Sequence, residues 1–165
     1  NKKIIQSMKK LSKKLTINCQ SNSYNFGYNI ADKFKFGKTI GMDEAEFRLV
    51  ARDKEEHLEV LIKQNHAIFK KFKSLIVTQG KKGCFIRKNN KIIFVPSVIN
   101  ISTDSTGSGD VFLSMFFISK IAKNFSDIES LMISHIAAGL HSNQLGNRLN
   151  FDVMDIYKVL SSIVK

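Results

Sequence analysis

Residues 104–110 read Asp-Ser-Thr-Gly-Ser-Gly-Asp, and the apolar run Val-Phe-Leu-Ser-Met-Phe-Phe-Ile follows at 111–118. Small residues ahead of an uncharged apolar run predict a tight loop that leads into a buried helix. Gly107 and Gly109 lack a Cβ atom, so a ligand can approach the backbone closely and a positive φ is allowed. The N–H groups of residues 107–110 would point out of the N-terminus of that helix, where the partial positive charge suits an anion such as phosphate.

Asp110 is an unusual neighbour for a bound phosphate, because the two negative charges repel each other. Its position is explained if the carboxylate faces a hydroxyl group and accepts the proton as that hydroxyl attacks the phosphate. The alternative is that Asp104 or Ser105 caps the helix and that the glycines form an ordinary turn.

The stretch 104–118 resembles the C-terminal signature of the ribokinase-like (PfkB) carbohydrate kinases, in which the pattern D-T-x-G-A-G-D precedes an apolar helix. Two residues depart from the pattern, since Ser105 replaces a Thr and Ser108 replaces an Ala. The resemblance implies an enzyme that transfers the γ-phosphoryl group of ATP with the help of Mg²⁺, with Asp110 as the catalytic base. It further implies that the transferred group is held by the backbone amides of Gly107, Ser108, Gly109 and Asp110. Phosphate, metal or substrate would lie beside Asp104, and Thr106 would belong to the nucleotide site.

Residues 78–83 read Thr-Gln-Gly-Lys-Lys-Gly and follow the apolar run Leu-Ile-Val at 75–77. That run predicts a strand buried on both faces, and ligands of open α/β sheets bind beyond the carboxyl ends of such strands. The segment is similar to the T-x-G-x-x-G segment of the same family. The resemblance implies that Thr78, Gly80 and Gly83 line the nucleotide. The alternative is a plain turn between a strand and a hairpin.

Residues 42–46 read Met-Asp-Glu-Ala-Glu and follow a candidate strand at 39–42. The family has an N-x-x-E segment here, and Glu46 matches the Glu that helps to hold Mg²⁺. Asp43 stands at the usual Asn, where it would add a second metal ligand or repel the nucleotide phosphates. Carboxylates are expected ligands for Mg²⁺. The alternative is a capping box, with Asp43 as the N-cap and Glu46 at the third helical position, and the two interpretations are compatible.

Two further segments add to the resemblance. Residues 18–29 contain many Asn and Ser residues and resemble a subgroup related to bifunctional heptose kinase/adenylyltransferase (ADP-heptose synthase) proteins, in which the amides would bind a polyhydroxyl group or a phosphate. The alternative is a solvated polar loop. The predicted helix 133–146 contains small residues that would pack beside an adenine, which places Asn143 in the nucleotide site. We interpret His135 and His141 on this helix as packing or surface residues.

Hydrophobic periodicity predicts helices at 4–11, 44–52, 58–72, from 111 onward, 127–144 and 152–164. It predicts strands at 15–19, 39–42 and 75–77 and a hairpin of 84–86 with 92–95. The alternation indicates a ribokinase-like α/β fold, with a mostly parallel central sheet, helices on both faces and an appended β-hairpin. We expect residues 1–165 to form a single domain, the C-terminal nucleotide-binding part of such a kinase. The chain opens on Asn1 rather than Met, so the N-terminal half is expected to be absent.

The charge, the apolar runs and the cysteines indicate which kinds of partner to expect. The formal net charge is +12, but Lys outnumbers Arg by 22 to 4, which suggests a compositional bias spread over the chain rather than a nucleic-acid-binding patch. No apolar run approaches the length of a membrane span. Cys19 and Cys84 lack a metal-type spacing, so free thiols in a reducing cytoplasm are expected. We therefore expect neither nucleic acid nor membrane as a partner.

The sequence thus predicts a cytoplasmic kinase that phosphorylates a hydroxyl group of a sugar or sugar phosphate. The resemblance to the heptose subgroup further implies that the acceptor is a heptose phosphate. It also implies a fused nucleotidyltransferase domain and a homodimer. Two alternatives of other classes stay open: a kinase-like module that binds nucleotide without catalysis, and a basic nucleic-acid-binding domain.

Overall fold

The structure is a computed structural model that describes residues 2–11, 13–21, 24, 31, 35–99, 103–122, 125–143 and 151–163. It contains two compact units. The first comprises Asn1–Gln79 and Phe85–Phe94, and the second comprises Gly80–Cys84 and Val95–Lys165.

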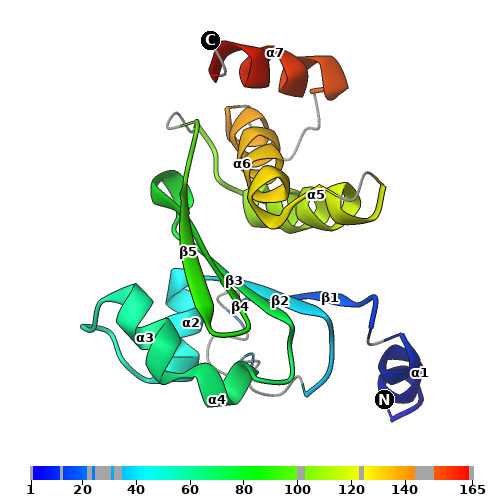
Figure 1. The fold of residues 1–165 in the computed structure, drawn as a ribbon, viewed down its shortest axis with the longest axis vertical. Helices are drawn as coiled ribbons and strands as arrows, with labels where there is room; N and C mark the ends of the chain where they lie inside the picture. The colour runs from blue at the N-terminus through cyan, green and yellow to red at the C-terminus, as the bar shows by residue number, and fades with distance from the viewer. Residues whose placement is uncertain are drawn as a thin grey trace. The chain divides into compact units, whose positions relative to one another are not determined.

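A five-stranded sheet is built in the order β1 (Thr16–Asn18), β2 (Thr39–Asp43), β3 (Ser74–Thr78), β4 (Gly83–Lys88) and β5 (Lys91–Pro96) (Figure 1). The pairs β1–β2 and β2–β3 are parallel. The strands β4 and β5 are joined by a two-residue turn in which Asn89 has a φ of 55°. A mostly parallel sheet with an attached hairpin is therefore confirmed.

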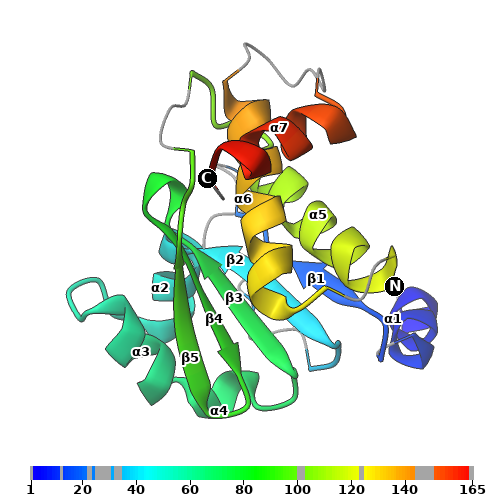
Figure 2. The same ribbon diagram turned by 45° about the horizontal axis from the view of Figure 1, so that its top comes forward.

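The core of the first unit lies where α2 (Glu44–Ala51), α3 (Leu58–Gln64) and α4 (His66–Phe69) pack together on the sheet (Figures 1 and 2). Phe47 of α2 and Phe69 of α4 are fully buried, with ring centroids 5.7 Å apart. The run at 75–77 is at most 1% exposed at each residue, as predicted for a strand covered on both faces. This burial fixes β3 as the centre of the unit.

Helix α1 (Lys2–Lys10) agrees with the prediction, but the single helix predicted at 58–72 is wrong. The chain leaves the helix at Asn65, between α3 and α4. The side-chain Nδ2 of Asn65 donates to the carbonyl oxygen of Leu61 at 2.9 Å, and its backbone N–H bonds the same oxygen at 3.0 Å. Asn side chains compete in this way with helical hydrogen bonds, which ends the helix despite its continuing apolar pattern.

The second unit contains a short 3₁₀ turn, Gly80–Lys82, and three helices: α5 (Ser108–Ala122), α6 (Asp127–Ser142) and α7 (Val153–Ile163). Helices α5 and α6 pack side by side (Figures 1 and 2). A capping box fixes the start of α6, since the Ser126 hydroxyl accepts the Glu129 N–H and the Glu129 carboxylate accepts the Ser126 N–H. A cluster around Ile136, Ala137 and Ile156 joins α6 to α7.

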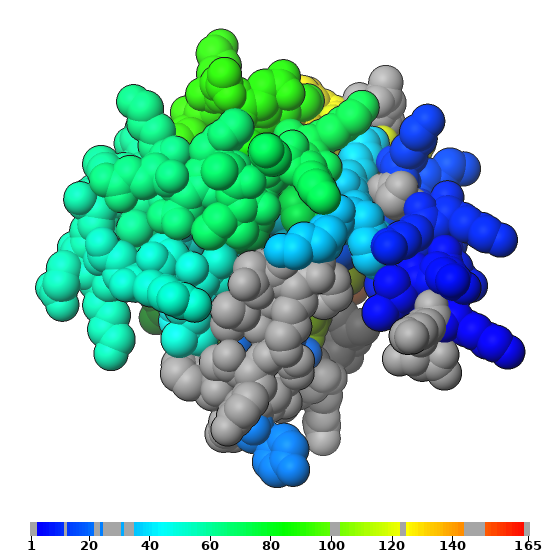
Figure 3. Space-filling model, turned by 90° about the horizontal axis from the view of Figure 1, so that it is seen from below, coloured from blue at the N-terminus to red at the C-terminus, as the bar shows by residue number. Residues whose placement is uncertain are grey.

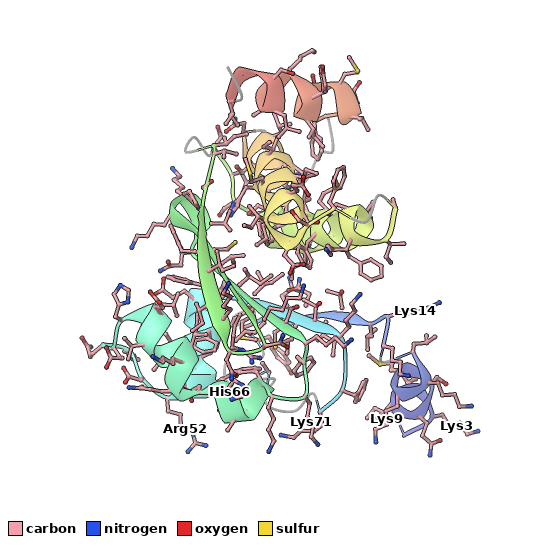
Figure 4. The ribbon with its side chains drawn as sticks, in the orientation of Figure 1. Lys3, Lys9, Lys14, Arg52, His66 and Lys71 are labelled. Carbon is pink, nitrogen blue, oxygen red and sulfur yellow. The ribbon has the colours of Figure 1, made fainter. Side chains whose placement is uncertain are left out.

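Positive charge is concentrated in the first unit, contrary to the expectation of an even bias. That unit has 19 Lys and Arg against 8 Asp and Glu, whereas the second unit has 7 against 6. The face of the first unit seen in Figure 3 includes α1 and the segments around α3 and α4. Lys3, Lys9, Arg52 and Lys71 project outward from this unit (Figure 4). A basic unit of this kind raises the local concentration of anions such as nucleotides and sugar phosphates.

Both cysteines are free and buried, as expected. Burial raises the pKa of the Cys84 thiol to about 12, so this thiol stays protonated and unreactive at neutral pH. None of the helices in the described ranges is both long enough and apolar enough to cross a membrane.

The burial of the Phe47 ring predicts that this residue supports the whole first unit. Phe47→Ala should lower the free energy of unfolding by about 3–5 kcal/mol, because it leaves a cavity beside Phe69. Tyr24→Ala is the control, since Tyr24 is 96% exposed, and its effect should stay within about 0.5 kcal/mol. Urea unfolding followed by far-ultraviolet circular dichroism measures both. Equal effects of the two changes would contradict this account of the core.

Candidate functional site

The first group of predicted site residues lies at the carboxyl ends of β2 and β3. Asp43 is the last residue of β2 and pairs in register with Thr78, the last residue of β3. Helix α2 begins at the next residue, Glu44. Parallel pairing thus brings Asp43, the start of α2 and Thr78 to one edge of the sheet, where open α/β sheets bind ligands.

Asp43 and Glu46 form the capping box that the sequence offered as an alternative. The Asp43 Oδ1 accepts the Glu46 N–H at 2.7 Å, and the Glu46 Oε2 accepts the Asp43 N–H at 2.9 Å. The other oxygen of Glu46, Oε1, accepts the N–H of Ser21. Glu46 is 9% exposed, so this carboxylate is buried and holds the chain beyond β1 to the start of α2.

A second network fixes the neighbouring turn. The Gln79 Nε2 donates to Glu44 Oε2 at 2.8 Å, and Arg48 forms an ion pair with Glu44 Oε1 at 2.8 Å. These bonds hold the residue after Thr78 to the first turn of α2. The contact of Glu44 with Gln79 was not predicted, because nothing in the local pattern links residues 35 positions apart.

The predicted metal ligands are Asp43 and Glu46. No group of three or more His, Cys, Asp or Glu side chains within the described ranges is placed to hold a metal ion. Asp43 is exposed and offers oxygens of the kind that Mg²⁺ prefers. Each Glu46 oxygen already accepts a backbone N–H, so this carboxylate is engaged in the fold. Mg²⁺ is commonly held by one or two carboxylates together with substrate phosphates and water, and the pair fits that mode.

The two glycines of the 78–83 segment have different environments. Gly80 has a φ of 54° and no atom within 4 Å of the position of a Cβ, so it leaves open space. Gly83 has a φ of 133°, and a Cβ there would lie 2.3 Å from the carbonyl oxygen of Val95. Gly83 is therefore required by the close approach of β5, which favours the turn interpretation at this position.

The second group of predicted residues forms the loop at 104–110. Gly107 adopts a φ of 76°, whereas Gly109 is not among the described glycines with positive φ. Helix α5 starts at Ser108, three residues earlier than predicted, so Asp110 lies in its first turn and is exposed. The predicted set of four free N–H groups is wrong for Ser108, because its N–H donates to the Ser105 carbonyl oxygen at 3.1 Å.

The first half of the loop is an Asx-type turn. The Asp104 Oδ1 accepts the N–H of Thr106 at 2.9 Å, so Asp104 stabilises the loop itself. Asn143 is the exposed C-cap of α6, and its N–H bonds the Gly139 carbonyl oxygen. A Cβ on Gly139 would lie 2.6 Å from the Ile99 side chain, so this small residue of α6 is needed for packing within the unit.

The two histidines of α6 are buried, as the packing interpretation predicted, but they differ in their contacts. Burial lowers the pKa of His135 to about 4, although a hydrogen bond to the Val95 backbone acts in the opposite direction. The ring packs edge-on against Phe112, with the ring centroids 4.9 Å apart. A neutral, packed His135 is unsuited to acid–base chemistry. His141 instead bonds the Thr106 carbonyl oxygen through Nε2 at 3.0 Å. This hydrogen bond to the loop was not predicted from the sequence.

The fold is that of a ribokinase-like α/β protein. A ribokinase from Thermotoga maritima superposes with a TM-score of 0.75 at 17% identity, over 94% of this chain and 53% of that protein. A nucleoside kinase from Methanocaldococcus jannaschii, described as an archaeal member of the ribokinase family, gives a TM-score of 0.61 at 21% identity, over 76% of this chain and 40% of that protein. At these identities the likeness establishes the fold alone.

The pfkB family of carbohydrate kinases matches residues 37–151, well over half of the sequence. The chain belongs to this family. It spans about half the length of the Thermotoga ribokinase. No curated protein matches it.

The capping box predicts how Glu46 responds to substitution. Glu46→Gln should lower the free energy of unfolding by about 1–3 kcal/mol, because an amide NH₂ would replace an oxygen that faces a backbone N–H. Glu59→Gln is the control, because Glu59 is exposed on α3 and its effect should stay within about 0.5 kcal/mol. Chemical denaturation of both variants measures the difference. A Glu46→Gln protein as stable as the wild type would show that its two hydrogen bonds contribute nothing.

Proposed function

We propose that this chain contains the nucleotide site and the catalytic base of an ATP-dependent kinase that acts on a sugar or sugar phosphate. The observation that supports the proposal is the exposed Asp110 in the first turn of α5, directly after a glycine loop with a left-handed residue and open space. Family membership supports the same class of reaction.

In the proposed reaction, a substrate hydroxyl oxygen attacks the γ-phosphorus of ATP and ADP leaves. Asp110 accepts the hydroxyl proton. The N–H groups of Gly107 and Gly109, together with the dipole of α5, stabilise the charge on the transferred phosphoryl group. Thr78 and Gly80 would line the nucleotide, and Asp104 and Thr106 would set the shape of the loop.

Mg²⁺ would neutralise phosphate charge when bound. A structure described as a ribokinase II from E. coli was solved in complex with ATP and Mg²⁺. It superposes with a TM-score of 0.64 at 19% identity, over 77% of this chain and 40% of that protein. Asp43 is the first candidate ligand in this chain, because its carboxylate is exposed. Glu46 would act through a metal-bound water, since both of its oxygens already accept backbone N–H groups. Asn143 is proposed for the adenine side of the site.

The finer substrate proposal is a heptose phosphate, which rests on the amide-rich segment at 18–29. Most of that segment lies outside the described residues. A cytoplasmic location, a homodimer and a fused nucleotidyltransferase domain complete this proposal; the free buried thiols support the first. A panel of sugars and sugar phosphates as acceptors tests the substrate class.

Gly109 tests whether the loop binds phosphate. Gly109→Val adds a side chain in open space without requiring a positive φ, so the melting temperature should change little. The affinity for ATP should fall at least about tenfold, because the side chain occupies the proposed phosphate position. Ser114→Val, at an exposed position further along α5, is the matched control and should bind ATP normally. Unchanged ATP affinity of the Gly109→Val protein in calorimetry would show that the loop is only a turn.

Asp110 tests the proposed chemistry. Asp110→Asn should reduce turnover at least about a hundredfold, the lower end for general-base catalysis. The affinity for ATP should hold or rise slightly, because a negative charge near the phosphates is removed while size and backbone N–H stay. Phosphorylation assays with the acceptor panel, with ATP binding measured in parallel, provide both values. A parallel loss of ATP affinity and melting temperature would instead indicate a structural role for Asp110. Wild-type turnover of the variant would show that Asp110 is not the catalytic base, and the chain would then be better described as a nucleotide-binding module.

A further inference from the structure

The glycine loop is held partly by its own hydrogen bonds. Thr106 N–H bonds Asp104, Ser108 N–H and Oγ both bond the Ser105 carbonyl oxygen, and Val111 N–H bonds the Gly107 carbonyl oxygen. Gly107 itself has a φ of 76° and, lacking a Cβ, can adopt other backbone conformations at little cost. Contacts from outside the loop can therefore restrict the conformation of the Gly107 peptide further.

Those contacts come from the last turn of α6. The Ser142 carbonyl oxygen accepts the N–H groups of Thr103 and Asp104, at 2.8 and 2.9 Å. The adjacent residue, His141, bonds the Thr106 carbonyl oxygen at 3.0 Å. Two consecutive residues at the end of one helix thus hold the entry to the loop and the residue before Gly107.

We propose that His141 is a positioning residue that orients the Gly107 N–H of the anion site through the Thr106–Gly107 peptide. The Thr106 carbonyl and the Gly107 N–H belong to the same planar, trans peptide unit, in which they point in opposite directions. A hydrogen bond that fixes the carbonyl toward α6 therefore directs the N–H away from α6. The inference rests on the proposed function, because it assigns this N–H to the transferred phosphoryl group.

The chemistry of the histidine ring supports this role. A carbonyl oxygen only accepts, so His141 must donate from a protonated Nε2. Its Nδ1 is buried and has no hydrogen-bond partner among the described residues, and the side chain is 1% exposed. The ring is thus held by packing in one orientation, and Thr106 is its hydrogen-bond partner within the described chain. A buried donor on a helix is well suited to fix the orientation of this glycine peptide.

His135 provides a matched control on the same helix. It is 5% exposed and contacts Phe112, and its hydrogen bond goes to the Val95 backbone instead of the loop. Replacing either histidine by Phe removes a buried hydrogen bond and keeps a ring of similar size. Only the change at 141 acts on the Thr106–Gly107 peptide.

The experiment uses calorimetric ATP binding and thermal unfolding of the whole chain. His141→Phe should weaken ATP binding about three- to tenfold, the effect of losing one hydrogen bond that orients a ligand contact. His141→Gln, which keeps an N–H donor near the position of Nε2, should restore most of the affinity. His135→Phe should lower the melting temperature but leave ATP affinity unchanged. Unchanged affinity of His141→Phe, or an equal loss in His135→Phe, would overturn the proposal.

A second readout separates this inference from the proposed function. In ¹H–¹⁵N spectra without ligand, His141→Phe should shift the Gly107 resonance and speed hydrogen exchange of the Thr103 and Asp104 amides, whereas His135→Phe should not. If the wild-type chain binds no ATP, the proposed function fails while these spectra still test the loop contact. If the spectra of His141→Phe match the wild type around Gly107, the positioning role is wrong whatever the chain binds.

Discussion

The parallel register of β2 on β3 is the constraint on which the first unit depends. It sets Asp43 beside Thr78. Helix α2 and its capping box begin directly after β2, and Gln79, the residue after Thr78, therefore lies within reach of Glu44. The register is held because β3 is buried on both faces, and a shift by one residue would exchange its two faces. Packing thus determines which polar groups meet at the edge of the sheet.

The second unit achieves its polar arrangement in another way. Its loop at 104–110 is only partly buried and contains two glycines, and hydrogen bonds with the end of α6 help to hold it. Helix α6 is itself fixed by its capping box at Ser126 and by the close approach of Ile99 to Gly139. The shape of the proposed anion site therefore depends on the packing of a helix that follows it in the sequence.

The buried carboxylate of Glu46 has a structural role beside a proposed metal site. As a buried acceptor of two N–H groups it stabilises the start of α2 and the segment after β1. The same contacts limit direct metal binding, so the exposed Asp43 becomes the stronger candidate ligand. Asp43 thus places a charge where the fold already uses a capping oxygen.

The sequence by itself determined the strands, most helices, the capping box at Asp43 and the glycine loop before α5, because these depend on residues within a few positions of one another. Local pattern failed at Asn65, where a side-chain hydrogen bond ends a helix whose apolar periodicity continues. It also could not find the contact of His141 with Thr106, which joins residues 35 positions apart. Only the tertiary structure decided that contact, because a hydrogen bond of this kind exists only after helix packing has brought the two segments together.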